Sequence, residues 1–181
     1  RSCGLVPFSC AFCLTDDDFV RFARMRAHDG TAGVYCEVKP EGRLLVAGGH
    51  ASEAGVRPDN QDFAGIYSAT ELERMHHGMI AAVADGVSGA KGGRIAAELS
   101  VRALIDGYYI QADTIGAAAA VQRVMAPYNR WLCAMGRSHS MAHAATTFTA
   151  CILKGRKGHI LHVGDSRAWH FRDGRLTLLT E

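Results

Sequence analysis

The sequence has little of what would assign it to a specialised class of protein. Its 20 Lys and Arg residues are nearly balanced by 18 Asp and Glu residues, so its net charge is only +2. That charge is too small to hold a nucleic acid or a membrane surface. No apolar run approaches the roughly 20 residues of a membrane span, and there is no secretory signal, repeat or low-complexity segment. With 48% hydrophobic and 21% charged residues, we expect an ordinary globular domain.

The cysteines lack the regular spacing of a disulfide framework. The six are Cys3, Cys10, Cys13, Cys36, Cys133 and Cys151. In a chain of 181 residues this irregular spacing predicts reduced thiols and a cytoplasmic location. Cys3, Cys10 and Cys13 offer three zinc ligands, but no second C-x-x-C and no paired histidines at a familiar spacing accompany them. Zinc is therefore disfavoured.

Hydrophobic periodicity predicts two helices and a series of antiparallel strands. The strands are expected at residues 43–47, 63–67, 79–84, 147–153, 159–163, 168–171 and 176–179, and the helices at 94–109 and 113–135. Residues 68–78 are expected to form a loop, and Pro127 should kink or split the second helix. Helices followed by hairpins indicate an α+β layered domain instead of a parallel sheet. Residues 1–44 show no clear period and are treated as a poorly specified extension.

Each helix carries an apolar stripe that should face the core. In the first it consists of Ile95, Ala96, Leu99, Ala103, Leu104 and Ile105. In the second it consists of Val121, Val124, Met125, Trp131, Leu132 and Met135. We expect Trp131 to contribute packing and not function.

The chain is organised around MIAAVADGVSGAKGG, residues 79–93. An apolar run with small residues predicts a buried strand, and it stops abruptly at Asp85 and Gly86. Gly86 has no Cβ, so the backbone there can approach a ligand closely. A carboxylate and a backbone carbonyl are the oxygen ligands that Mg²⁺ or Mn²⁺ prefers. Asp85 and Gly86 are therefore candidate metal ligands.

Other interpretations of this region stay open or are excluded by spacing. Asp-Gly is also common turn chemistry, so Asp85 is equally suited to a turn or helix-cap role. The glycines fit neither the phosphate-binding P-loop nor the dinucleotide fingerprint G-x-G-x-x-G. The adjacent His76 and His77 are metal ligands only as a minor alternative to solvated loop residues.

Three separated stretches together resemble a known family. They are RPDNQD at residues 57–62, VADGVSG at 83–89, and VGDSR at 163–167, the last followed by a hairpin with RDG at 172–174. The motif TTFT at 146–149 adds a typical strand entry. Their order and content resemble the protein phosphatase 2C (PPM) family of metal-dependent serine/threonine phosphatases. The similarity is to the bacterial type, such as the phosphatase half of fused kinase–phosphatase proteins, and it covers residues 45–181.

The resemblance implies a fold, a metal centre and a substrate. The fold is a β-sandwich of two antiparallel sheets flanked by helices, with two Mn²⁺ or Mg²⁺ ions at one edge. By position, Asp85 would bridge both ions, Gly86 would bind one through its carbonyl, and Asp62 would hold a metal-bound water. Arg57 would contact the phosphate of a phosphoprotein substrate. A protein kinase domain in the same native chain is an open expectation.

The chemistry of these residues agrees with the implied reaction. Hydrolysis of a phosphate monoester is extremely slow without a catalyst. Two cations about 3.5–4 Å apart lower the pKa of a bound water and neutralise the phosphoryl oxygens. Arg57 suits the phosphate because its guanidinium is planar and permanently charged. No serine or cysteine nucleophile is required.

The chain also departs from the family pattern. Gln61 stands where many members have glutamate, Val87 where animal members have a histidine, and Ala142 where bacterial members have an aspartate for a third metal. Asp165 belongs to a motif that is mainly a structural turn in the family.

The resemblance implies two further metal-binding aspartates, which would lie beyond the last residue of this chain. We therefore expect an incomplete domain with weak or no activity. The alternatives are an inactive regulatory or binding module with the same fold, and an α+β domain whose motifs are plain turns.

Overall fold

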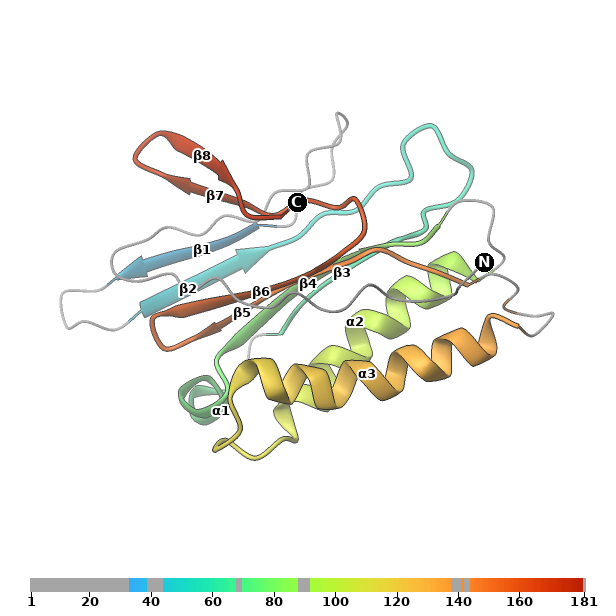
Figure 1. The fold of residues 1–181 in the computed structure, drawn as a ribbon. Helices are drawn as coiled ribbons and strands as arrows, with labels where there is room; N and C mark the ends of the chain where they lie inside the picture. Colours follow the sequence, from blue (N-terminus) through green and yellow to red (C-terminus); the bar gives the residue numbers. More distant parts are fainter. Residues whose placement is uncertain are drawn as a thin grey trace.

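A four-stranded antiparallel sheet is the centre of the chain in the computed structural model (Figure 1). The structure describes residues 33–38, 44–67, 70–87, 92–137, 141 and 144–180. The elements in order are β1 (Gly33–Val38), β2 (Leu44–Gly49), β3 (Asp62–Tyr67), α1 (Glu71–His76), β4 (Met79–Asp85), α2 (Gly93–Tyr109), α3 (Ala117–Met135), β5 (Phe148–Lys154), β6 (Lys157–Val163), β7 (Trp169–Arg172) and β8 (Arg175–Leu178). The central sheet has the order β3-β4-β5-β6, while β1-β2 and β7-β8 form separate two-stranded antiparallel ladders.

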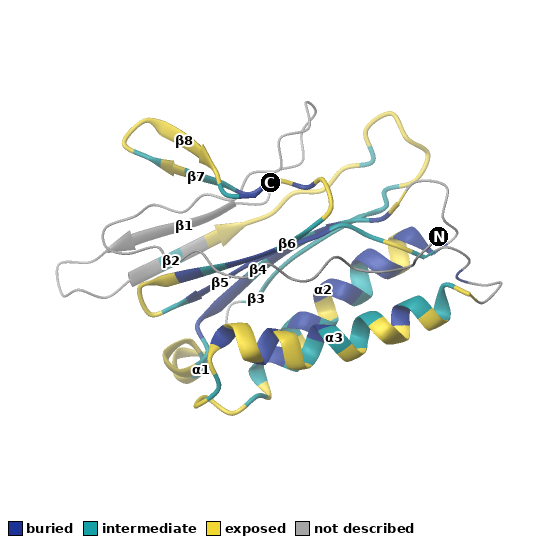
Figure 2. Cartoon of the chain, in the orientation of Figure 1, coloured by how far each residue is buried: buried dark blue, intermediate teal, exposed yellow. Residues whose placement is uncertain are grey.

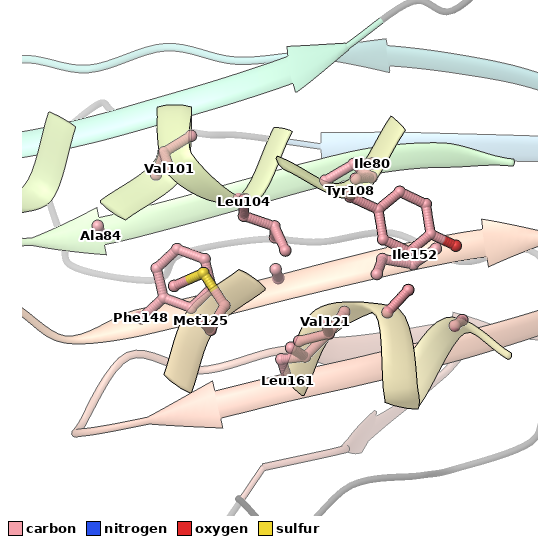
Figure 3. Packing of buried hydrophobic residues seen from close by; sticks show 14 of the residues in the cluster. Ile80, Ala84, Val101, Leu104, Tyr108, Val121, Met125, Phe148, Ile152 and Leu161 are labelled. Carbon is pink, nitrogen blue, oxygen red and sulfur yellow. The ribbon is translucent and has the colours of Figure 1, made fainter. Parts of the chain in front are cut away.

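Helices α2 and α3 lie side by side over one face of the central sheet, and their inward faces are buried (Figures 1 and 2). The core between helices and sheet contains Ile80, Ala84, Val101, Leu104, Tyr108, Val121, Met125, Phe148, Ile152 and Leu161 (Figure 3). Burying each of the larger aliphatic side chains contributes about 1.5–3 kcal/mol. A Cβ on Gly107 would lie 2.5 Å from Cγ1 of Val124, so this glycine lets the two helices approach each other closely.

The opposite face of the sheet is covered as well. Met79, Cys151 and Leu153 form a second buried cluster there, against which Val46 of β2 packs. A Cβ on Gly48 of β2 would lie 3.0 Å from the side chain of Ile66 in β3. Because both faces are covered, β5 is buried along almost its whole length instead of alternating. The layers of antiparallel strands with helices on one side confirm the predicted α+β class.

Several local predictions were wrong. Residues 68–78 were expected to be a loop, but residues 71–76 form α1, which begins with a capping box between Thr70 and Glu73. Helix α3 begins at Ala117 instead of residue 113 or 114 and runs without a break through Pro127. Trp131 and Ile95 were assigned to the core, yet they are 43% and 47% exposed.

The expected extension, residues 1–44, contributes the first strand of a hairpin. β1 pairs with β2, with Gly33 opposite Gly49 and Val38 opposite Leu44. The expected boundary after residue 44 thus falls at the start of β2. Cys3, Cys10 and Cys13 lie outside the described residues. Among the helices that the structure describes, none is both long and apolar enough to cross a membrane.

Candidate functional site

The two candidate carboxylates lie opposite each other at one end of the central sheet. β3 begins at Asp62, β4 ends at Asp85, and the antiparallel register pairs these two residues directly. Directly paired residues project from the same face of a sheet, with Cβ atoms about 4.5–5.5 Å apart. Both residues are half-buried. Carboxylates separated by 23 positions in the sequence are therefore neighbours in the fold.

The main chain of Asp85 is held by Thr147. The Asp85 N–H donates to Thr147 Oγ1 at 3.0 Å, and the Thr147 N–H donates to the Asp85 carbonyl at 2.9 Å. The Thr147 hydroxyl also shares a hydrogen bond of 2.8 Å with the hydroxyl of Ser166, which is buried. Gly164 has a φ of +105°, and a Cβ there would lie 2.7 Å from Thr147 Cγ2. The motif at 163–167 thus supports Asp85 through Thr147.

Gly86 is buried where β4 meets the N-terminus of α2. Its N–H donates to the main-chain carbonyl of Gln61 at 3.0 Å, and the next N–H, of Val87, donates to Ala145 at 2.9 Å. A Cβ on Gly86 would lie 2.4 Å from the carbonyl carbon and oxygen of Gly93. Any side chain at position 86 would therefore collide with the backbone of α2, so close packing requires glycine here.

Arg57 lies on an exposed turn that precedes β3. Its main-chain N–H donates to the Ala54 carbonyl at 3.2 Å. Further along, Asn60 Oδ1 accepts a 2.9 Å hydrogen bond from the Asp62 N–H, and Asn60 Nδ2 donates to Ser52 Oγ at 2.8 Å. Asn60 therefore fixes the way in which the loop that carries Arg57 enters β3 at Asp62. Asn60 lies in the motif at 57–62, but neither Asn60 nor Ser52 was predicted to have a role at the site.

Arg94 is a further residue of the site that was not predicted. It lies in the first turn of α2, and its guanidinium donates a hydrogen bond to the carbonyl of Asp62. The same guanidinium lies 5.1 Å from the ring centroid of Phe63 and 3.9 Å from Glu98. A positive charge in the first turn of a helix interacts unfavourably with the helix dipole. The unusual position of this arginine in the sequence was therefore the signal that could have pointed to a role for Arg94. Arg94 brings a permanent positive charge beside Asp62.

The donor chemistry of this site suits a hard divalent cation. Two carboxylates placed directly opposite each other repel, and a cation between them would offset that repulsion. Within the described ranges, however, no three His, Cys, Asp or Glu side chains come together in a way that could hold a metal. Asp62, Asp85 and the Gly86 carbonyl therefore fit part of a metal centre and do not complete one.

Other candidate residues lie away from this site or outside the description. His76 Nδ1 lies 2.9 Å from Asp113 Oδ2, and the ring of His77 packs edge-on against Tyr108. Both histidines precede the start of β4, whereas Asp85 is at its end, so they lie away from the carboxylate pair. Asp165 is exposed. Residues 88–91 and Ala142 are outside the described residues.

The sequence is similar to a known protein family and to a curated bacterial protein. The family model described as protein phosphatase 2C matches residues 58–181, which is more than half of the chain. Serine/threonine protein phosphatase PstP of Mycobacterium tuberculosis is 29% identical over 129 residues. That match covers 70% of this chain but 23% of PstP. The chain thus spans about a quarter of the length of this curated relative.

Solved structures of bacterial phosphatases are similar as well. The M. tuberculosis PstP structure has 27% identity and a TM-score of 0.53, over 70% of this chain and 49% of that one. The catalytic domain of PstP, solved in complex with two manganese ions, has 26% identity and a TM-score of 0.51, over 69% of this chain and 50% of that one. The serine/threonine phosphatase of S. agalactiae has a TM-score of 0.59 at 24% identity, over 84% of this chain and 55% of that one, and it supports the fold.

Proposed function

Because the chain belongs to the protein phosphatase 2C family, we propose that it is part of a metal-dependent protein serine/threonine phosphatase. The proposed reaction is hydrolysis of phosphoserine and phosphothreonine in proteins. The observation that carries the proposal is the direct pairing of Asp62 with Asp85, beside the buried Gly86, whose carbonyl would be a third oxygen donor. The relative solved with two manganese ions supports the choice of cation.

The proposed roles follow from the chemistry of each group. Asp85 would bind both cations, Gly86 would bind one through its carbonyl oxygen, and Asp62 would hold a water of the metal shell. When bound, two Mn²⁺ or Mg²⁺ ions would supply an activated water and neutralise phosphoryl charge. Arg57, on an exposed turn, would orient the phosphate through its planar guanidinium.

A second candidate function is an inactive phosphatase-fold module that binds a partner. It is favoured by the absence, within the described part of the chain, of any cluster of three metal-binding side chains. Two carboxylates leave half of the four positive charges of two cations uncompensated. We therefore propose that these 181 residues alone have weak activity or none.

Two wider expectations also remain proposals. The irregular spacing of the six cysteines supports a reducing compartment such as the cytoplasm. A kinase domain in the same native chain would pair phosphorylation with its reversal.

Manganese binding tests the proposed metal centre. Calorimetric titration should give saturable Mn²⁺ binding to the chain, and Asp85→Asn should weaken it by at least tenfold, because a neutral amide is a poorer ligand for a hard cation. Asp165→Asn removes an exposed carboxylate outside the pair and should leave the affinity unchanged. Equal affinity of the chain and Asp85→Asn would refute the assignment.

Hydrolysis tests the reaction itself. In the gene product that contains this chain, Mn²⁺-dependent release of phosphate from a phosphothreonine peptide should be lost in Asp85→Asn. Manganese binding without any such hydrolysis would favour the inactive module.

A further inference from the structure

Both the main chain and the side chain of Gln61 contact Gly86. The residue is half-buried and comes directly before β3, where continuation of the β3–β4 register places it opposite Gly86. Its main-chain carbonyl accepts the 3.0 Å hydrogen bond from the Gly86 N–H. The amide nitrogen of Gly86 is thereby fixed, while its carbonyl oxygen is the atom assigned to a cation in the proposed function.

The side-chain amide of Gln61 reaches that carbonyl oxygen. With Nε2 turned toward β4, the amide donates to Gly86 O at 3.2 Å and to Val87 O at 3.1 Å. The opposite orientation would place Oε1 against the same two carbonyl oxygens, and three acceptors would then repel one another. The surroundings therefore select the orientation in which both N–H groups of the amide are donors.

We infer that Gln61 is a positioning residue that holds the Gly86 carbonyl oxygen in the direction needed for a divalent cation. The inference rests on the proposed function, in which that oxygen is a metal ligand. A carbonyl oxygen has two lone pairs, so it can accept the Gln61 N–H and still bind a cation. A group that orients a ligand in this way commonly changes metal affinity by 10- to 100-fold when it is lost.

The Gly86 carbonyl belongs to the same peptide as the Val87 N–H, which donates to Ala145 O at 2.9 Å. That hydrogen bond holds the N–H side of the peptide. The close approach of Gly93 excludes a side chain at Gly86, so no side chain of residue 86 can contact the carbonyl side. Donation from the Gln61 amide to Gly86 O holds the carbonyl side, and the same amide also donates to Val87 O.

The amide does what a carboxylate at position 61 could not do. A glutamate there would add negative charge near the cations, but an ionised carboxylate has no N–H to donate. It would face two carbonyl oxygens with acceptors only. The Gln61 amide also lies close to α2, because a Cβ on Gly93 would lie 2.8 Å from its terminal atom. Compared with a glutamate, Gln61 therefore adds no negative charge near the cations, but it can hold the Gly86 peptide by hydrogen bonds.

The test compares Mn²⁺ affinity in matched variants of the whole chain. Gln61→Met keeps the length of the side chain and removes both donors, so the dissociation constant for Mn²⁺ should rise about tenfold or more. Gln111→Met is the control, because Gln111 Nε2 donates a comparable 2.9 Å hydrogen bond to Gly107 O at the far end of α2. This control should bind Mn²⁺ as the unaltered chain does, even if it unfolds at a lower temperature.

A spectroscopic measurement covers the case in which Gln61→Met does not fold. In the unaltered chain, the side-chain NH₂ protons of Gln61 should exchange with solvent more slowly than those of Gln122, which is exposed on α3. Equal exchange at the two residues would overturn the inference, and so would equal Mn²⁺ affinity of the unaltered chain and a folded Gln61→Met. Failure of the unaltered gene product that contains this chain to bind Mn²⁺ at all would instead remove the proposed function, and the inference with it.

Discussion

Replacement of Gly86 by alanine tests whether the junction between β4 and α2 is as tight as the structure shows. The added Cβ would lie 2.4 Å from the carbonyl carbon and oxygen of Gly93 and 2.9 Å from the N atom of Arg94. Ordinary contacts of a Cβ are about 3.4–4 Å. Because all three obstacles are backbone atoms, no rotamer change relieves the collision. The N-terminus of α2 must move by roughly 1 Å, or β4 must move away from it.

The expected cost follows from this geometry. Overpacking a core typically costs 1–3 kcal/mol, and backbone obstacles put Gly86→Ala at the upper end, at about 3 kcal/mol. Domains of 150–250 residues lose about 2–4 °C of Tm for each 1 kcal/mol, so the Tm should fall by about 10 °C. Gly49→Ala is the matched control, since Gly49 is exposed and a Cβ there meets no atom within 4 Å. It should change stability by no more than about 0.5 kcal/mol.

Urea unfolding followed by circular dichroism measures both variants against the unaltered chain. A loss below about 1 kcal/mol for Gly86→Ala, with an unchanged slope against urea, would refute the reasoning, because it would mean that α2 can shift at little cost. A large loss in Gly49→Ala would equally undermine it, since alanine would then be unfavourable without a collision.

Three further changes have expected outcomes. Arg57→Ala should leave stability within about 0.5 kcal/mol but raise KM for a phosphopeptide in the gene product that contains this chain, and unchanged KM and kcat would contradict its phosphate role. Thr147→Val should cost about 1–3 kcal/mol in urea unfolding by leaving the Asp85 N–H without its acceptor, whereas Thr177→Val on exposed β8 serves as a nearly neutral control. Burial lowers the pKa of His159 below its ordinary 6.5, so the unfolded chain takes up a proton more readily than the folded chain. Stability should therefore fall as pH drops below about 6.5, and the fall should be smaller in His159→Leu; equal pH profiles would argue against it.

Much of the fold could be predicted from sequence because its signals are local. The hairpins from β5 to β8 combine short runs of apolar and β-branched residues with short glycine turns, and both long helices have a 3.6-residue period. Helix α1 escaped notice because six residues are too few to show a period, although Thr70 and Glu73 already had the spacing of a capping box. Trp131 and Ile95 were wrongly assigned to the buried faces of their helices. A helix buries only one stripe of its surface, and a count of apolar residues overestimates the width of that stripe.

Only part of the candidate site could be predicted, because only some of its residues have a local sequence signal. Asp85 and Gly86 stand out because a strand ends and a glycine loop begins there. The position of Asp62 opposite Asp85 depends on the register of two strands, which no local pattern specifies. The contacts of Arg94 with the Asp62 carbonyl and of Ser166 with Thr147 join residues 32 and 19 positions apart. Such contacts arise from tertiary packing, so periodicity and motif spacing could not predict them.

The register between β3 and β4 has a consequence for how the chain tolerates insertions. Side chains alternate between the two faces of a sheet, so one residue inserted within either strand would turn one of the two carboxylates to the opposite face. The proposed metal binding should then be weakened even if the sheet stayed folded. Residues inserted in the connection that contains α1 would leave the pairing of Asp62 with Asp85 intact. A peptide tag placed in that connection should be compatible with the site, whereas a single-residue insertion within β3 or β4 should separate the two carboxylates.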